Sequence, residues 1–444
     1  MGQQQFDAIV IGAGPVGEVC AGELADAGMS VAIFERELVS GECSFWACIP
    51  SKTLLRPGEA LAAARQAPGA KQAVSGNLDA GEALGWRNFM VSDWDDSGQL
   101  PWLKEKGIEL VRGDARLAGP GKVEADGAIY EAERIVIATG SDPVFPPIEG
   151  LQGLEGVWTN REATGVKQLP ASLLILGGGP VGVEMGQALA RMGSAVTIVE
   201  GEERLLPGEA PPVGEALADG LRADGIELRL GSFASEAASE DEAFVLRFEG
   251  GEELRAEKLL VATGRRPRID DIGLDSVGIE PGKQGIEVDE RLRAGDGVWA
   301  IGDATGVALF THLGKYQARI AARDILGDEA RADYRAIPRV TFTDPQVAAV
   351  GEAEGEATGT APLASVARTS TYTREYADRP GFLTVVSDGS KLTGAYAVGP
   401  ESGEWLQQAT LAIRAEIPLD VLRDTIQPFP TFSEAFVNAL ADLG

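Results

Sequence analysis

The chain has 444 residues, of which 44% are hydrophobic and 24% are charged. This composition is typical of a soluble globular protein, and the length allows about three domains. The formal net charge is −29 at pH 7. Such acidity argues against sequence-independent binding to nucleic acids or to anionic membranes, because both require a clustered cationic surface.

The N-terminal segment has no basic stretch before its apolar run, and that run leads into a glycine turn rather than a cleavage site. No apolar stretch approaches the ~18 residues that cross a bilayer, since even residues 173–176 lead directly into three glycines. We therefore expect a cytoplasmic protein with no membrane partner. In that compartment a lasting disulfide is usually catalytic rather than structural.

The first predicted elements are a β-branched strand at residues 8–11, the turn Gly12-x-Gly14-x-x-Gly17, an amphipathic helix and a strand ending in Glu35. This order is typical of a dinucleotide-binding βαβ unit. Its first glycine permits a tight turn, its second lets the backbone approach a pyrophosphate, and its third allows close helix packing. The acid at the end of the second strand binds ribose hydroxyls, so we expect this role for Glu35.

Two cysteines five positions apart, Cys43 and Cys48, follow in the segment SGECSFWACIPSK. A thiol pair just beyond a nucleotide-binding turn can store electrons and pass them to a substrate. A helix beginning near Pro50 would lower the thiol pKa through its dipole. The alternative is a pair of buried free thiols. A zinc site is disfavoured, because Cys20 and a single histidine do not complete four sensible ligands, and we predict no metal.

The βαβ pattern then recurs with every matching residue shifted by 165 positions. A strand at residues 173–176 leads into Gly177-x-Gly179-x-x-Gly182 and, after a helix, into a strand that ends at Glu200. One glycine-rich turn is a weak signal. Two full copies with acids at the same spacing predict two dinucleotide sites.

Two further strands end in Ala-Thr-Gly, at residues 134–140 and 258–264, and each is followed by a proline. We interpret them as crossovers between domains. An apolar strand within residues 296–303 delivers Asp303 at its end, and a helix is predicted from about Leu309 to Ile325.

After Pro338 no dinucleotide signature occurs, and strands and helices are mixed. Strands are predicted near residues 339–342, 382–387 and 392–398, and helices near residues 403–415, 419–425 and 433–443. This mixture indicates a third, α+β domain. Residues 201–210 and 350–362 are acidic or rich in glycine and alanine, so we expect surface loops there.

In combination these motifs resemble those of the pyridine nucleotide disulfide oxidoreductases, the family of dihydrolipoamide dehydrogenase, glutathione reductase and mercuric reductase. The resemblance covers essentially the whole chain. It rests on both glycine turns, the cysteine segment with Lys52, both Ala-Thr-Gly segments, Glu184, Asp303 and the run at residues 343–351.

The resemblance implies an α/β fold with two Rossmann-like domains, one for FAD and one for NAD(P), and a C-terminal α+β dimerisation domain of a homodimer. The implied boundaries are residues 1–148 and 265–335 for the two parts of the FAD domain, 149–264 for the NAD(P) domain and 336–444 for the dimerisation domain.

By this resemblance the first glycine turn and Glu35 bind FAD, and the second turn and Glu200 bind the nicotinamide nucleotide. The other implied cofactor-binding residues are Lys52, Ala115, Thr139, Gly140, Gly264, Asp303 and Thr311. Glu200 favours NADH over NADPH, because a carboxylate binds free ribose hydroxyls and repels a 2′-phosphate. Arg204 lies close enough in sequence to keep NADPH open.

The resemblance also implies catalytic residues. Cys48 matches the sulfur that faces the flavin, and Cys43 matches the sulfur that exchanges with the substrate. Lys52 and Glu184 match an ion pair near the flavin. Electrons would pass from NADH through the flavin to the Cys43–Cys48 disulfide, and the dithiol would then reduce the acceptor.

One position departs from the family pattern. Family members usually carry a C-terminal histidine that is oriented by a glutamate and completes the partner subunit's site. Here Phe429 takes the position of the histidine. Glu434 takes the position of the glutamate, and the resemblance implies a catalytic role for it. Losing a positioned base typically costs about 10²–10⁴ in rate, so ordinary turnover of lipoamide or glutathione is not expected. His312 matches a flavin-supporting histidine. Trp46 either packs or reshapes the acceptor pocket.

We therefore expect a homodimeric flavoprotein that oxidises NADH and reduces a small-molecule disulfide or another thiol-reactive acceptor through Cys43 and Cys48. One alternative is an NADH diaphorase or quinone reductase in which the cysteines are bystanders. Another is a mercuric-reductase-like metal-ion reductase, although the chain has no C-terminal cysteine pair. A third is a nucleotide-binding sensor without turnover.

Overall fold

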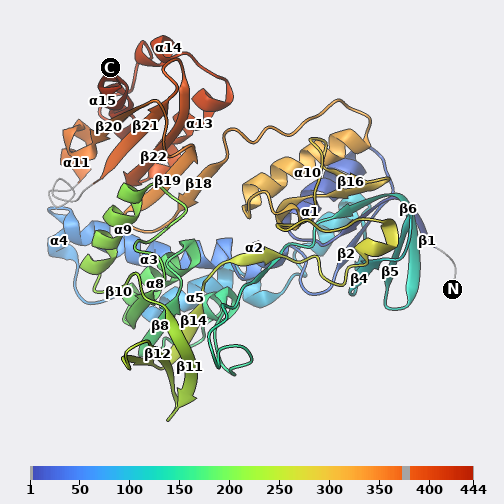
Figure 1. The fold of residues 1–444 in the computed structure, drawn as a ribbon, viewed down its shortest axis with the longest axis horizontal. Coiled ribbons are helices and arrows are strands. Elements are labelled where there is room, and N and C mark those ends of the chain that lie inside the picture. Colours follow the sequence, from blue (N-terminus) through green and yellow to red (C-terminus); the bar gives the residue numbers. More distant parts are fainter. Residues whose placement is uncertain (1–3, 373–380, 444) are drawn as a thin grey trace. The chain divides into compact units, whose positions relative to one another are not determined.

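The computed structural model describes residues 4–372 and 381–443. The chain forms two compact units, each assembled from segments that lie far apart in the sequence (Figure 1). The first consists of Met1–Pro50, Arg87–Val144 and Gly264–Asp333, and the second of Ser51–Trp86, Phe145–Thr263 and Tyr334–Gly444.

The first unit is built on an eight-stranded sheet within the described residues. Its main path runs in the order β16 (Arg293–Gly295), β17 (Val298–Ala300), β6 (Ala128–Ile137), β1 (Gln4–Ile11), β2 (Val31–Glu35) and β3 (Glu109–Arg112), and β4 (Ala115–Leu117) and β5 (Lys122–Ala125) continue from β6. From β17 to β3 the strands are parallel, and β16 is antiparallel to β17. The carboxyl ends of β1 and β2, which carry the first glycine turn and Glu35, therefore meet at one edge.

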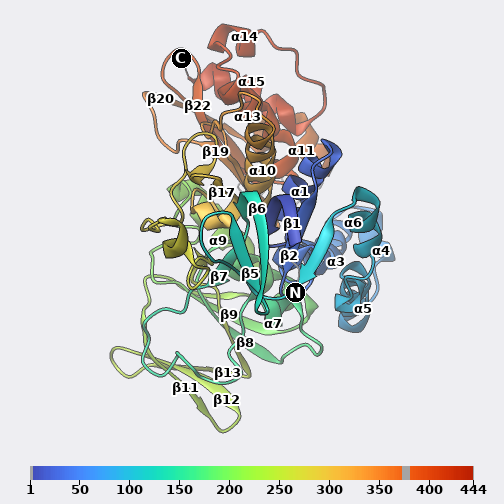
Figure 2. The same ribbon diagram turned by 90° about the vertical axis from the view of Figure 1, so that its right-hand side faces the viewer.

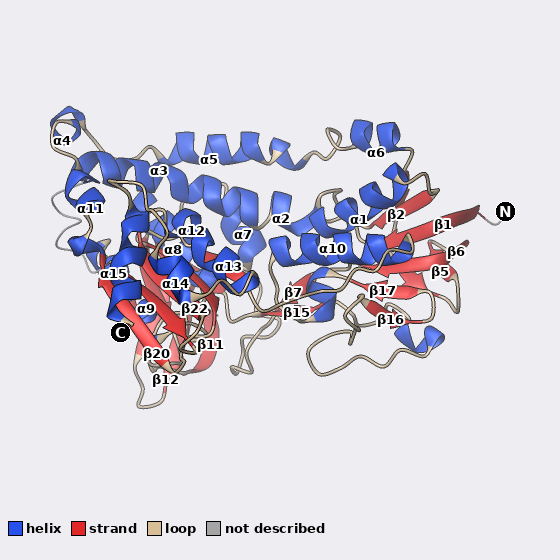
Figure 3. Ribbon diagram, turned by 90° about the horizontal axis from the view of Figure 1, so that it is seen from above, coloured by secondary structure: helices blue, strands red, loops and turns tan. Residues whose placement is uncertain are grey.

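Helix α1 (Pro15–Asp26) connects β1 to β2 and packs beside α10 (Thr311–Ile325), as Figures 1 and 3 show. Residues 8–11 of β1 are all buried, as expected for a central parallel strand covered on both faces. The remaining elements of this unit are α2 (Gly41–Phe45), η1 (Ser92–Trp94), α6 (Leu100–Lys106), η2 (Leu274–Val277), η3 (Gly302–Thr305) and the antiparallel pair β7 (Ser141–Pro143) and β15 (Arg265–Pro267). The pair β7–β15 directly follows the two Ala-Thr-Gly segments.

The second unit contains a four-stranded parallel sheet in the order β10 (Glu227–Arg229), β9 (Ala195–Val199), β8 (Ser172–Leu176) and β14 (Lys258–Val261). Its helices are α4 (Ala70–Ala73), α7 (Asn160–Thr164), α8 (Pro180–Met192) and α9 (Pro211–Ala223). Helix α3 (Cys48–Gln66) enters it from the first unit, and α5 (Ala80–Met90) leads back. Between β10 and β14 in the sequence, the chain forms an antiparallel sheet of β11 (Ala234–Glu240), β12 (Ala243–Phe248) and β13 (Glu253–Ala256) (Figure 2).

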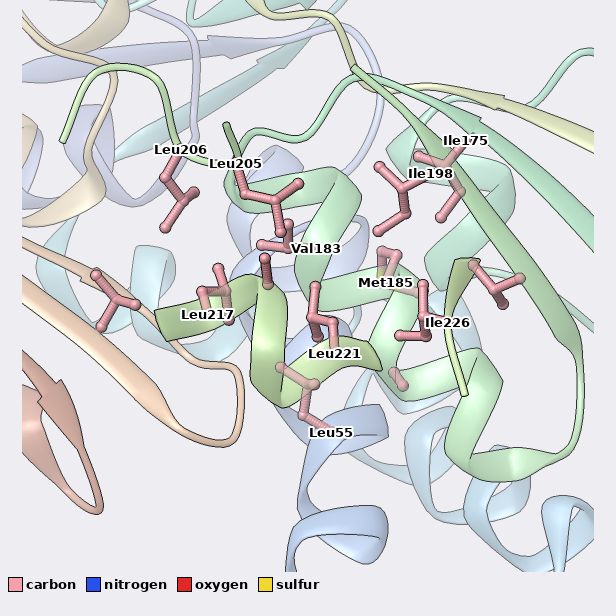
Figure 4. Close-up of a cluster of buried hydrophobic side chains, with 14 of the residues drawn as sticks. Leu55, Ile175, Val183, Met185, Ile198, Leu205, Leu206, Leu217, Leu221 and Ile226 are labelled. Carbon is pink, nitrogen blue, oxygen red and sulfur yellow. The ribbon is translucent and has the colours of Figure 1, made fainter. Parts of the chain in front are cut away.

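A large apolar cluster lies between this parallel sheet and its helices (Figure 4). Ile175 of β8 and Ile198 of β9 are fully buried with Val183 of α8 and Leu217 of α9, and Leu55 of α3 joins them. Burying one such side chain contributes about 1.5–3 kcal/mol. The cluster fixes the second glycine turn, because β8 and α8 flank it.

The C-terminal part of the second unit is an antiparallel five-stranded sheet in the order β18 (Pro338–Thr341), β19 (Gln346–Gly351), β22 (Leu392–Gly399), β21 (Phe382–Ser387) and β20 (Ala357–Pro362). It is accompanied by η4 (Leu363–Ser365), α11 (Ala367–Tyr372), α12 (Ser402–Trp405), α13 (Gln407–Arg414), α14 (Leu419–Arg423), η6 (Phe432–Glu434) and α15 (Ala435–Asp442). The predicted α/β class with a C-terminal α+β part is confirmed.

One prediction about this sheet is wrong. Residues 350–362 are not a surface loop, because β19 continues to Gly351 and β20 occupies residues 357–362. A Cβ atom at Gly359 would lie 2.1 Å from the carbonyl oxygen of Ala439. The small residues that suggested a loop are therefore required by the close approach of α15 to β20.

Two smaller expectations have different outcomes. Residues 201–210 contain neither helix nor strand, as expected of a loop. The helix expected at residues 403–415 is divided at Leu406 into α12 and α13. Within the described segments, no helix combines the length and apolar character required to cross a bilayer.

Candidate active site and nucleotide sites

The two glycine turns share one geometry. Gly12 and Gly177 have φ values of +104° and +107°, in the region that favours glycine. A Cβ atom would lie 2.3 Å from the carbonyl oxygen of Ala138 in the first turn and 2.4 Å from that of Ala262 in the second. The alanine of each Ala-Thr-Gly segment therefore packs against the first glycine of a turn. Any residue with a side chain would clash at that glycine position.

The remaining glycines of the turns divide into crowded and open positions. A Cβ atom at Gly17 or Gly182 would lie 1.9 or 2.0 Å from the carbonyl oxygen of the first glycine of its own turn. At Gly14 and Gly179, by contrast, no heavy atom lies within 4 Å of that position. The open positions lie at the N-termini of α1 and α8, where backbone amides and the helix dipole favour a phosphate. Both turns thus fit the pyrophosphate of a dinucleotide.

Each acid at the end of a second strand is held against its turn. The Glu35 carboxylate accepts hydrogen bonds from the backbone amides of Ala13 (2.9 Å) and Glu37 (2.8 Å), and burial raises its pKa. Glu200 accepts the equivalent bonds from Gly178 (2.6 Å) and from the amide two residues after it (2.9 Å). The repeat therefore extends to individual hydrogen bonds, and each carboxylate is fixed against the backbone of its own glycine turn.

Cys43 and Cys48 form a disulfide. Cys43 lies in α2, and Cys48 is the first residue of α3, slightly before the start expected near Pro50. The hydroxyl of Thr311, the first residue of α10, donates to the sulfur of Cys43 at 3.3 Å and lies 3.5 Å from the sulfur of Cys48. Two helix N-termini therefore face the sulfur pair, and both favour a thiolate.

The contact of Thr311 with the sulfurs was not foreseen, because the sequence predicted only a flavin-binding role for this residue. Thr311 is 268 and 263 residues from the two cysteines, and no local spacing connects them. Only the strand order, which brings the start of α10 to the edge that carries the first turn, would have suggested the contact.

The segment between the cysteines contacts Trp94, which in turn lies against the buried guanidinium of Arg87. The indole nitrogen of Trp94 donates to the carbonyl oxygen of Phe45 at 3.2 Å. The guanidinium of Arg87 lies 5.1 Å from the Trp94 ring and is 1% exposed; burial lowers its pKa to about 10. The Trp46 ring lies 5.8 Å from that of Phe45. Together these side chains hold the geometry of the loop.

A chain of polar contacts runs from the cysteine loop to Asp303. Glu42 pairs with Arg265 at 3.5 Å, Arg265 donates to the hydroxyl of Ser141 at 2.8 Å, and Ser141 donates to Asp303 at 2.6 Å. Burial raises the pKa of Asp303, and the bond from Ser141 partly opposes this. The Thr139 hydroxyl nearby donates to a backbone carbonyl at 2.6 Å.

The other predicted cofactor-binding positions are backbone features of the first unit. Gly140 and Gly264 have φ values of +77° and +118°, with open space around a Cβ position. Ala115 begins β4. His312 stacks on Phe310 with ring centroids 5.2 Å apart, an arrangement that supports α10 next to Thr311.

Lys52 and Glu184 form an ion pair with a distance of 2.7 Å between the ammonium and the carboxylate. Glu184 is 4% exposed, and its other oxygen accepts the backbone amide of Phe342 at 2.9 Å. The ammonium of Lys52 lies 4.8 Å from the Phe342 ring centroid. The pair joins α3 to α8 in the second unit, and Lys52 follows Cys48 by about one turn of α3.

The two C-terminal candidates, Phe429 and Glu434, have different surroundings. Phe429 is 75% exposed. The Glu434 carboxylate accepts the backbone amide of Thr431 at 3.2 Å, which makes it part of a capping box at η6. Within residues 4–372 and 381–443, no group of three or more His, Cys, Asp or Glu side chains is arranged to hold a metal ion.

Comparison with known proteins agrees with this arrangement. Residues 6–324 match the family described as pyridine nucleotide-disulphide oxidoreductase, and residues 337–440 match its dimerisation domain. The chain is 34% identical to a dihydrolipoyl dehydrogenase of Thermus scotoductus, over 98% of this chain and 96% of the relative. It is 31% identical to a mercuric reductase of Bacillus cereus, over 99% of this chain and 72% of the relative.

Solved structures of similar fold include a Cu(II) complex of the HOCl-induced flavoprotein disulfide reductase RclA from Escherichia coli. It is 28% identical, with a TM-score of 0.85, and the match covers 98% of this chain and 99% of the other. Family matches over most of the length, the two turns and the disulfide lead to one conclusion. The chain belongs to the pyridine nucleotide-disulphide oxidoreductase family, whose members are FAD-dependent enzymes that use a pyridine nucleotide.

Proposed function

We propose that this flavoprotein oxidises NADH and reduces a small disulfide, or another acceptor that reacts with thiols, through Cys43 and Cys48. The observation that carries the proposal is the disulfide at the N-termini of α3 and α10, with the Thr311 hydroxyl against both sulfurs. A bystander cysteine pair has no need of a donor placed to stabilise a thiolate.

The site residues of the first unit have separate roles in this reaction. The first glycine turn, Glu35 and Asp303 would bind FAD, which when bound supplies the group that accepts hydride from the nicotinamide. After two electrons and two protons convert the disulfide to two thiols, the Cys43 thiolate attacks one sulfur of the acceptor disulfide. That bond breaks, one acceptor thiol leaves, and a mixed disulfide forms on Cys43. The Cys48 thiolate then attacks the Cys43 sulfur, which restores the disulfide and releases the second acceptor thiol.

We infer a restriction on the acceptor from Phe429. No described side chain at the C-terminal position can protonate a leaving thiolate, and a leaving thiol of low pKa needs no such help. The enzyme should therefore reduce disulfides of acidic thiols, such as aromatic disulfides, much faster than lipoamide. Lipoamide turnover equal to that of an aromatic disulfide would refute the restriction.

NADH is the proposed electron donor. The Glu200 carboxylate is fixed at the second turn, where it would bind free ribose hydroxyls and repel a 2′-phosphate. Arg204, the residue that could have favoured NADPH, donates from a terminal N–H group to the carbonyl oxygen of Pro207 at 2.9 Å. We expect kcat/KM to be higher for NADH than for NADPH. Glu200→Gln should reduce this difference, because the amide carries no charge that repels a 2′-phosphate.

A soft metal ion is the second candidate acceptor. A dithiol binds soft ions readily, binding needs no base at position 429, and mercuric reductases are among the relatives. NADH oxidation driven by Hg²⁺ or Cu²⁺, compared with oxidation driven by an aromatic disulfide, decides between the two acceptors.

The discriminating variant is Cys43→Ser. If the cysteines work as proposed, disulfide reduction is abolished while NADH still reduces the bound flavin. If the enzyme is a quinone reductase with bystander cysteines, quinone reduction is the main activity and survives the change. Full disulfide turnover by Cys43→Ser would reject the proposal.

The match of residues 337–440 to a dimerisation domain supports a homodimer. We further propose that residues 336–444 provide the dimer contact, that residues 1–148 and 265–335 bind FAD, and that residues 149–264 bind NADH. The cytoplasmic location stays a prediction.

A further inference from the structure

An exposed aromatic ring lies next to the second nucleotide site. Phe233 is 74% exposed, whereas most aromatic side chains of folded proteins are largely buried. Its ring lies over the backbone of Gly201, the residue that follows Glu200. A Cβ atom at Gly201 would be 2.4 Å from the nearest ring atom of Phe233. The glycine thus leaves room for the ring beside the ribose-binding acid.

The backbone holds Phe233 in this place. The amide of Ser232 donates to the carbonyl oxygen of Glu200 at 3.0 Å, and the amide of Gly231 donates to that of Glu202 at 2.9 Å. Strand β11 begins directly after Phe233 and is paired with β12. The ring is therefore presented by a loop tied on both sides, although little of its surface is covered.

The sheet order determines what would lie against the ring. The pyrophosphate belongs at Gly179 on α8, and the adenosine ribose belongs at Glu200, at the carboxyl end of β9. The adenine base must then continue along the same edge of the sheet. The next strand on that side is β10, and Phe233 lies in the segment that follows it.

The first copy of the repeat has no such ring. There the amide of Gly113 donates to the carbonyl oxygen of Glu35 at 3.1 Å, as Ser232 does to Glu200, so Asp114 takes the place of Phe233. The Asp114 side chain is 84% exposed and pairs with Arg36 at 3.7 Å. An aromatic residue is thus specific to the site assigned to the nicotinamide nucleotide.

We propose that Phe233 forms a stacking wall for the adenine ring of the dinucleotide. This inference rests on the assignment of the second glycine turn to the pyridine nucleotide. An aromatic face suits a nucleobase because stacking needs no matched hydrogen bonds. This role differs from that proposed for Glu200, which concerns the choice between NADH and NADPH. Because Phe233 would contact only the adenosine half of the dinucleotide, its replacement should affect binding and not the chemical step.

The test is calorimetric titration of the oxidised holoenzyme with ADP-ribose, which contains the adenosine half but cannot transfer hydride. Phe233→Ala should weaken ADP-ribose binding about 5- to 100-fold, and Phe233→Trp should keep it close to that of the wild type. Binding of nicotinamide mononucleotide should be the same in all three proteins. In turnover, Phe233→Ala should raise KM for NADH and leave kcat nearly unchanged.

Phe89→Ala is the matched control, because Phe89 is also a phenylalanine and is 75% exposed, on α5; it should bind ADP-ribose like the wild type. Equal ADP-ribose affinity of Phe233→Ala and wild type overturns the stacking wall while leaving the proposed function intact. Equal weakening of both ligands also overturns it, since that is general damage to the site. If the wild type binds no ADP-ribose, the nucleotide assignment fails together with this inference.

Discussion

The Thr311 hydroxyl is placed to decide how easily Cys43 ionises. It donates to the Cys43 sulfur at 3.3 Å, and a hydrogen bond to a charged group is worth about 1.5–3 kcal/mol. Thr311→Val should therefore slow the alkylation of reduced Cys43 by iodoacetamide at neutral pH, by about 10-fold or more, because the thiolate loses this hydrogen bond. Alkylation rates measured as a function of pH test this, and Thr311→Ser should react like the wild type. Identical pH profiles for Val and Thr would show that the hydroxyl does not stabilise the thiolate.

Cys20 has the opposite environment. It is fully buried in α1, and burial raises the pKa of its thiol from 9.0 to about 12. Between these values the unfolded chain loses a proton that the folded chain keeps, so the free energy of unfolding falls as pH rises. Cys20→Ala should make the free energy of unfolding depend less steeply on pH in this range, by up to about 1.4 kcal/mol per pH unit. Denaturant titrations at pH 9 and above measure the slope, and parallel slopes for both proteins would contradict the argument.

Residue roles could be predicted where the signal is local. Gly12 and Glu35 lie within one short motif, and their structural partners follow from the turn itself. Thr311 and Phe233 are different, because each acquires its place from strand order rather than spacing. An isolated threonine or phenylalanine carries no sequence pattern, so neither contact could be predicted.

At the scale of elements, the Lys52–Glu184 pair ties α3 to α8. Glu184 is nearly inaccessible, whereas the Lys52 side chain is 37% exposed, so solvent weakens the attraction. We expect a double-mutant cycle of Glu184→Gln and Lys52→Met to give a coupling of about 1–2 kcal/mol in the free energy of unfolding. Glutamine still accepts the Phe342 amide, which separates the charge from the hydrogen bond. Additive single effects would mean that the pair contributes nothing to stability.

The repeated βαβ units could be predicted because the whole pattern of strand, glycine turn, helix and acid recurs in the sequence at a constant shift. Strand β20 could not, since its glycine and alanine residues suggested a loop. The close contact of Gly359 with α15 is a tertiary requirement. The break between α12 and α13 at Leu406 likewise has no Gly or Pro to announce it.

For the whole molecule, the decisive departure is Phe429. We expect Phe429→His to raise lipoamide turnover by up to about 10²-fold, because an imidazole can protonate the leaving thiolate. The gain requires Glu434 to exchange its bond with Thr431 for one with the new ring. Phe429→Leu is the control and should give no gain. If histidine and leucine variants have equal lipoamide turnover, the absence of a base does not limit the enzyme.

The proposed activity requires the Cys43–Cys48 disulfide to store electrons that it exchanges with bound FAD. Anaerobic reductive titration of the holoenzyme tests this most directly. We expect the wild type to take up two electron pairs per FAD, one on the flavin and one on the disulfide. At the midpoint a long-wavelength absorbance band should appear, from a thiolate beside the oxidised flavin. Cys48→Ser should lose both the second electron pair and the band. Saturation of the wild type after a single electron pair per FAD, without the band, would contradict the proposed activity.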